Sequence, residues 1–130
     1  ETLNIETESL EERVMKDTGG KGADIAFVAV GAPPAIKQAT QIIKKRGLVT
    51  VVGIFGKEVS LDMTWVVRRE IKIHGAYDAK PVNFPQSIDL INRGLVDVDS
   101  VLTHKLSLDQ AEEGFKVALD KTGGKVVFNS

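Results

Sequence analysis

Ala-Asp-Ile-Ala-Phe-Val-Ala-Val-Gly (Ala23 to Gly31) and Gly-Leu-Val-Thr-Val-Val-Gly (Gly47 to Gly53) are the two apolar runs that decide the fold of this chain. A segment of helical length, which starts at Pro33, separates them. Short runs rich in valine and isoleucine that are joined by a helix are typical of a buried parallel β-α-β unit. The near-continuous apolar character of the first strand, Ile25 to Val30, predicts burial on both of its faces.

The composition excludes several classes of protein. The chain has 130 residues, of which 42% are hydrophobic and 27% charged, and its net charge is -1. This charge balance, with the two signs interspersed, argues against binding to nucleic acid, which needs a basic face. No apolar run approaches the ~20 residues that cross a membrane. The absence of cysteine excludes disulfides and thiolate metal sites, and we expect a cytoplasmic protein.

Helix signals flank the first apolar run. Ser9 to Glu12 has capping-box spacing and predicts a helix that ends at the glycines after Thr18. Pro33 predicts the start of a second helix, whose core-facing stripe is Ile36, Ala39 and Ile43. We expect this helix to carry Lys44, Lys45 and Arg46 in its last turn and to end at Gly47, before a strand over Leu48 to Val52.

The rest of the chain continues the alternation of helices and strands, which predicts an α/β fold. Trp65 to Val67 indicates a short helical connector, and residues 71–74 alternate as an edge strand does. The pattern changes after Asp78. The later expectations are a helix over Asn83 to Arg93 with Ile88 and Ile91 inward, a helix opened by Ser107 and ended by Gly123 and Gly124 with Ala111, Phe115 and Ala118 on one side, and a strand over Lys125 to Phe128.

Gly31, Gly53 and Gly75 follow successive predicted strands. Ligands of open parallel sheets bind beyond the carboxyl ends of the strands, and backbone without a bulky side chain can approach a flat ligand closely. A single glycine can instead simply turn the chain, but three at successive strand ends favour a ligand-binding ledge. The two histidines, His74 and His104, have no companion ligand at metal spacing, so we expect surface or packing roles for them.

Five stretches, in their order and spacing, resemble the carboxyl-terminal half of the zinc-type medium-chain alcohol dehydrogenases. The likeness is greatest to the branch of sorbitol, threonine and butanediol dehydrogenases. The stretches are Gly20-Lys-Gly-Ala-Asp-Ile-Ala-Phe-Val-Ala-Val-Gly31, Arg46-Gly-Leu-Val-Thr-Val-Val-Gly53, Arg69-Glu-Ile-Lys-Ile-His-Gly75, Leu102-Thr-His-Lys-Leu-Ser-Leu108 and Gly124-Lys-Val-Val-Phe128.

This resemblance implies the second half of a Rossmann-type parallel sheet in residues 1–78. It also implies that residues 79–130 form a carboxyl-terminal extension of helices and strands that rejoins a catalytic domain. The nicotinamide part of NAD or NADP would then lie along three strand ends, and the edge strand near Lys72 to Tyr77 would pair with its copy in a homo-oligomer. The residues implied in cofactor binding are Val30, Gly31, Val52, Gly53, Ile54, Gly75, Ala76 and Tyr77.

The parts of these enzymes that hold zinc and anchor the pyrophosphate have no counterpart in the 130 residues. The resemblance therefore implies zinc only in a parent enzyme, and no catalytic residue or metal ligand is assigned here. The first hypothesis is a fragment, inactive alone, of an NAD(P)-dependent enzyme that moves a hydride from a secondary alcohol to nicotinamide. A non-enzymatic α/β module that binds or dimerises is the alternative, and a zinc-free relative like the quinone reductases is a third possibility.

Overall fold

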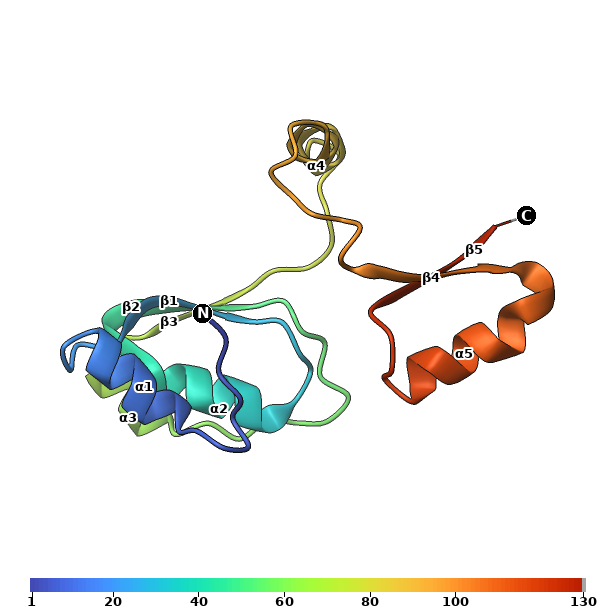
Figure 1. Cartoon of the computed structure of the whole chain (residues 1–130). Helices are drawn as coiled ribbons and strands as arrows, with labels where there is room; N and C mark the ends of the chain where they lie inside the picture. The colour runs from blue at the N-terminus through green and yellow to red at the C-terminus, as the bar shows by residue number, and fades with distance from the viewer. Residues whose placement is uncertain (130) are drawn as a thin grey trace. The chain divides into compact units, whose positions relative to one another are not determined.

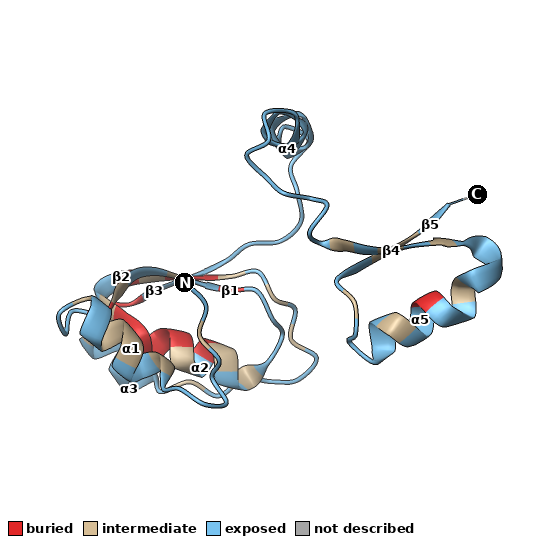
Figure 2. Cartoon of the chain, viewed as in Figure 1, coloured by how far each residue is buried: buried red, intermediate tan, exposed pale blue. Residues whose placement is uncertain are grey.

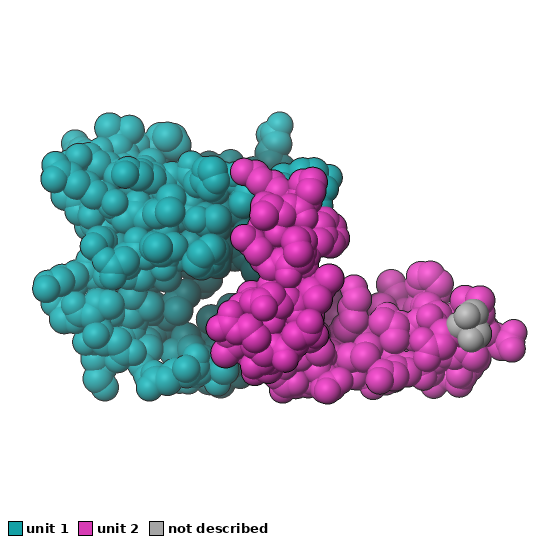
Figure 3. Space-filling model, turned by 90° about the horizontal axis from the view of Figure 1, so that it is seen from above, with its two compact units in different colours: residues 1–78 teal, residues 79–130 magenta. Residues whose placement is uncertain are grey.

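The computed structural model describes residues 1–129 and divides the chain into two compact units, residues 1–78 and residues 79–130 (Figure 3). Each unit combines helices with parallel strands, so the predicted α/β class is confirmed. Among the described residues, no helix is both long and apolar enough to cross a membrane.

The first unit is a three-stranded parallel sheet with its helices on one side (Figure 1). The strand order is β1-β2-β3, so β3 is an edge strand, as its alternating sequence predicts. Parallel neighbours need crossover connections, and helices supply them here. In chain order the elements are α1 (Leu10–Asp17), β1 (Ala23–Val28), α2 (Pro33–Ile42), β2 (Ile43–Val51), α3 (Met63–Arg68) and β3 (Lys72–Gly75).

Two of these helices begin at side chains that accept a backbone hydrogen bond. The Ser9 hydroxyl accepts from the amide of Glu12 at 3.3 Å, and the Asp62 carboxylate accepts from the amide of Trp65 at 3.0 Å. Such caps satisfy amides that have no partner within the helix. The predicted start of α1 and the predicted helical connector around Trp65 are therefore confirmed.

The prediction that α2 continues to Gly47 is wrong. The helix ends at Ile42, and Ile43 already belongs to β2, where it pairs with Ala23 and is fully buried. The next pair in the register is Ile25 with Leu48, so the basic residues between them bulge out, and Arg46 takes a left-handed φ of 64°. Gly47 serves close packing, because a Cβ there would lie 2.5 Å from Cγ1 of Ile43.

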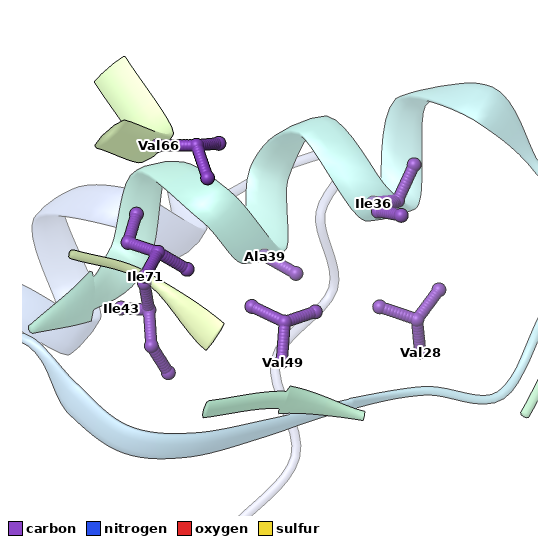
Figure 4. Close-up of a cluster of buried hydrophobic side chains, with 7 residues drawn as sticks. All are labelled: Val28, Ile36, Ala39, Ile43, Val49, Val66 and Ile71. Carbon is purple, nitrogen blue, oxygen red and sulfur yellow. The ribbon is translucent and has the colours of Figure 1, made fainter. Parts of the chain in front are cut away.

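The core lies between the sheet and the helices of this unit (Figures 2 and 4). Val49 in the central strand and Ile43 are completely buried, and the cluster also includes Val28, Ile36, Ala39, Val66 and Ile71. Burial of apolar surface in this layer is the main source of stability. The alternate side chains of β1 belong to the opposite face of the sheet, since successive side chains of a strand point to opposite sides.

Burial of β1 on both faces, predicted from its apolar run, is also wrong for this unit. Ile25 is 52% exposed and Phe27 is 71% exposed, because α1, α2 and α3 all pack on the other face (Figure 1). An apolar run thus predicts which residues favour burial, but it does not show whether elements of the same unit pack on both faces of the strand.

The second unit contains α4 (Asn83–Asn92), β4 (Leu102–Ser107), a short 3₁₀ turn η1 (Leu108–Gln110), α5 (Ala111–Leu119) and β5 (Lys125–Asn129). Strands β4 and β5 pair in parallel, and α5 forms the crossover between them. No strand was expected over β4, whereas the predicted strand at β5 and the capping box of Ser107 with Gln110 are confirmed.

Two expectations about helix faces in this unit are wrong. Ile88 and Ile91 of α4 are 58% and 41% exposed, so this helix buries neither residue. On α5 the buried position is Gly114, while Phe115 and Ala118 are exposed. Phe115 instead lies beside Phe128, with 6.4 Å between the ring centroids.

The end of α5 also differs from the prediction. The helix stops at Leu119, and the left-handed residue beyond it is Lys121, with φ 54°, and neither Gly123 nor Gly124. Both glycines lie where a side chain has no room. A Cβ on Gly123 would lie 2.8 Å from Cγ1 of Val117, and one on Gly124 would lie 2.6 Å from the carbonyl oxygen of Val101.

Candidate functional site

The candidate site is the edge of the first unit where the three parallel strands end. Two backbone amides, those of Val52 and Gly53, donate to the carbonyl oxygen of Val28, each at 2.9 Å. The amide of Ala76 donates to the carbonyl oxygen of Val51 at 2.8 Å. These bonds continue beyond the regular ladders and tie the segments after β1, β2 and β3 together. The predicted residues from three separate stretches thus meet at one edge.

Gly31 and Gly53 lie where two backbone segments touch. A Cβ on Gly31 would overlap the carbonyl oxygen of Ile54 and lie 2.7 Å from its carbonyl carbon. A Cβ on Gly53 would overlap the carbonyl group of Val30 and lie 2.8 Å from the amide nitrogen of Gly31. Real Cβ atoms do not approach backbone so closely, so neither position accepts a side chain without movement of the loops. This reciprocal approach of the pairs Val30-Gly31 and Gly53-Ile54 is called the glycine contact below.

Gly75 differs from these two glycines. No heavy atom lies within 4 Å of the position that its Cβ would occupy, so the space above it is open. A flat group could therefore approach the backbone at the end of β3. Gly75 thus keeps the geometry that a ligand ledge requires.

The side chains around the ledge are apolar and exposed. Val30 is 56% exposed and Ile54 is 76% exposed; Val52 and Tyr77 are exposed as well. Isolated exposed apolar residues are common, but several that gather at one edge of a sheet are typical of a surface that contacts a ligand or another protein. Apolar side chains beside accessible backbone suit a flat, weakly polar ring better than a metal ion.

Zinc does not fit the residues at hand. In the part of the chain that the structure describes, no three side chains of the ligating types, histidine, cysteine, aspartate and glutamate, form a group that could hold a metal ion. His74 lies exposed in the edge strand β3. His104 is in β4, where its Nδ1 lies 2.8 Å from the hydroxyl oxygen of Thr103.

Three ion pairs of the first unit lie near the amino-terminal ends of its strands. Arg46 donates to Glu70 through Nε at 2.9 Å, and Lys45 lies 3.3 Å from the same carboxylate. The hydrogen bond from Arg46, and then that from Lys45, lowers the pKa of Glu70 below its ordinary value. Lys44 likewise lowers the pKa of Asp24, first through a hydrogen bond to the carboxylate and then through its positive charge. These pairs connect the bulge in β2 to its neighbours, which is a structural role that the sequence did not reveal.

A separate hollow lies among the helices. It has a volume of about 520 Å³ and is lined by residues of α1, α2 and α3 and of the loop before α3, among them Lys37, Thr40 and Trp65. Trp65 is engaged within the protein: its Nε1 donates to the carbonyl oxygen of Thr40 at 2.9 Å, and the guanidinium of Arg69 lies 4.7 Å from its ring centroid. None of the eight predicted site residues lines this hollow.

Comparisons with known proteins agree with the sequence resemblance. Residues 1–93 match the model of the zinc-binding dehydrogenase family. D-arabitol-phosphate dehydrogenase of Enterococcus avium is 32% identical over 95% of this chain and 35% of its own length. Erythritol/L-threitol dehydrogenase of Mycolicibacterium smegmatis is also 32% identical, over 96% of this chain and 35% of its own length.

Solved structures show the same relationship. The crystal structure of 2R,3R-butanediol dehydrogenase from Bacillus subtilis superimposes with a TM-score of 0.85 and 26% identity, over 97% of this chain and 36% of that one. Alcohol dehydrogenase TADH from Thermus sp. ATN1 shares the fold with a TM-score of 0.90 at 20% identity, over 98% of this chain and 37% of that one. The chain therefore spans about a third of the length of the relatives it matches. By its sequence and its fold, this chain belongs to the family of zinc-binding dehydrogenases.

Proposed function

We propose that this chain supplies the nicotinamide-facing half of the coenzyme domain in an NAD(P)-dependent alcohol or polyol dehydrogenase. The open space above Gly75, at an edge bordered by exposed apolar side chains, is the observation that carries the proposal. It lies at the carboxyl ends of parallel strands, where open α/β sheets bind their ligands. Membership of the dehydrogenase family favours this function over a non-enzymatic binding module.

Nicotinamide, when bound, would supply the acceptor for a hydride from the carbon of a secondary alcohol. The residues of this chain would orient the ring. Val30, Val52 and Ile54 offer apolar contacts that exclude water, and a carboxamide would approach the open backbone at Gly75, at the end of β3. Tyr77, which is 84% exposed, would close the same pocket. Residues 79–130 would rejoin the domain that selects the alcohol.

The chain by itself should not oxidise alcohols, because the described residues contain no group that could hold zinc. An assay of the isolated chain with NAD or NADP, zinc and polyols such as sorbitol or threitol should show no reduced cofactor above the background rate. Turnover that depends on zinc and on the chain would refute this part of the proposal. A cytoplasmic location stays a prediction.

The edge strand β3 is proposed to pair with β3 of a second copy. All of its residues are exposed, and an unpaired edge presents a row of backbone donors and acceptors. Sedimentation velocity should therefore show association that rises with concentration, and Ile73→Pro, which removes one amide from this strand, should weaken it. A monomer at every concentration would contradict the pairing.

Binding of the nicotinamide half is tested by NMR of the methyl groups. Titration of the labelled chain with NADH should shift the methyl resonances of Val30, Val52, Ile54 and Ala76. It should leave those of Val49, which is completely buried in the core, in place. We expect weak, millimolar binding, since a ligand held by part of its site loses most of its affinity. No response at the strand ends, or a response at the hollow beside Trp65 instead, would refute the proposed site.

A further inference from the structure

Gly31 and Gly53, two of the residues predicted to contact the cofactor, are closely packed against other backbone. Neither has a backbone φ in the left-handed range, so the conformation at these positions does not require glycine. Space does: each would drive a Cβ into the backbone of the other segment. The faces of both residues that lack a side chain are therefore already occupied by protein.

We propose that Gly31 and Gly53 are positioning residues, which set the spacing between the segments after β1 and β2 instead of offering a surface to the cofactor. This inference rests on the proposed function. The ring would be held by the neighbours of the two glycines, above all by the side chains of Val30 and Ile54, and by the open backbone at Gly75. Gly75 is then the glycine of the three that serves as a ledge.

The glycine contact is reciprocal, so the distance between the segments after β1 and β2 depends on both glycines. Val28 fixes the same distance, since its carbonyl oxygen accepts hydrogen bonds from the amides of both Val52 and Gly53 at 2.9 Å. These bonds hold the second segment over the end of β1. A side chain at position 31 or 53 would force the segments apart by about 1–1.5 Å, the difference between the clashing distances and an ordinary carbon-to-oxygen contact. A displacement of this size in a binding site can cost about 100-fold in function.

The experiment uses the full 130-residue chain, with NADH as the probe and methyl NMR as the readout. In the chain without ligand, Gly31→Ala or Gly53→Ala should shift the resonances of both Val30 and Ile54. Each variant should also weaken the response to NADH by 10-fold or more. Gly75→Ala should instead leave the ligand-free spectrum of Val30 and Ile54 unchanged while it weakens NADH binding.

Two controls separate positioning from general loss of stability. Gly56→Ala adds a methyl group where no heavy atom lies within 4 Å and where φ is outside the left-handed range. It should therefore change neither the resonances of Val30 and Ile54 nor the binding of NADH. Ile43→Val lowers the stability of the core at the amino-terminal end of β2, away from the strand ends that form the site, and should keep the full response to NADH while the protein is folded. A loss of response in Ile43→Val equal to that in the glycine variants would mean a purely structural role.

The wild-type chain provides a second measurement, in case Gly31→Ala or Gly53→Ala fails to fold. Nuclear Overhauser effects between the Hα protons of Gly31 and the protons of Gly53 and Ile54 should be present without ligand and unchanged by NADH. Effects that appear only with NADH would overturn the inference. If wild type responds to NADH and the folded glycine variants respond equally, the inference alone fails. If wild type does not respond at all, the proposed function fails first.

Discussion

Truncation of one side chain on each face of the sheet tests whether the sheet of the first unit is covered on one face only. Val49 of β2 is completely buried beneath the helices, and Phe27 of β1 is 71% exposed on the other face. Each is replaced by alanine in a separate variant. Both changes lose a similar amount of β propensity, so the difference between them reports the burial of the two side chains.

The smaller side chain should matter more. Val49→Ala removes two buried methyl groups, worth about 0.8 kcal/mol each in transfer, and leaves a cavity, for a total loss of about 2–3 kcal/mol. A fully buried phenylalanine costs about 3–5 kcal/mol when it is cut to alanine, and with under a third of Phe27 buried the expected loss is about 1 kcal/mol. The order of the two losses is thus opposite to the order of side-chain size.

Urea unfolding followed by tryptophan fluorescence measures both losses. Trp65 is the single tryptophan of the chain and lies in the first unit, so its emission reports this unit alone. The titrations are repeated at several protein concentrations. A loss for Phe27→Ala that equals or exceeds that for Val49→Ala at low concentration would refute the one-sided core. A loss that grows with concentration would show that a second copy covers Phe27.

Three further predictions concern single contacts. Because Arg46 lowers the pKa of Glu70, this carboxylate stabilises the folded state at pH values above its ordinary pKa of 4.5, and the benefit is lost as the pH falls through the lowered value. Stability measured from pH 7 to pH 3 should therefore show Glu70→Gln converging with wild type in acid, and parallel curves would contradict this. Gly114→Ala places a Cβ 2.5 Å from Cζ of Phe128 and should destabilise the second unit by about 1–3 kcal/mol, seen as faster amide exchange in β4 and β5, whereas unchanged exchange would refute the close packing. Ser107→Ala removes the capping box before α5 and should cost about 1 kcal/mol in the same exchange measurement, while Ser107→Asp should restore most of it.

The residues of the candidate site could be predicted from the sequence, but the different roles of its three glycines could not. Glycines after apolar runs predicted which residues would gather at the strand ends, because parallel strands place all their carboxyl ends at one edge. Gly31, Gly53 and Gly75 cannot be distinguished by their sequence context, because each follows a predicted strand. Only the structure separates them: the Cβ position of Gly31 is filled by the backbone of Ile54 and that of Gly53 by the backbone of Val30, whereas that of Gly75 is open. Contacts between segments more than twenty residues apart leave no local pattern.

The amino-acid sequence by itself determined the α/β class and the parallel pairing, because hydrophobic periodicity, caps and glycine stops are local signals. The family was indicated separately, by five stretches that resemble its members. The tertiary structure decided which apolar residues are covered. Phe27 and Ile88 look like core residues in the sequence, yet both are exposed, while Gly114 is buried against Phe128. Burial depends on whether another element packs over a residue, and this is settled by the folded arrangement of distant segments and not by the residue's own type.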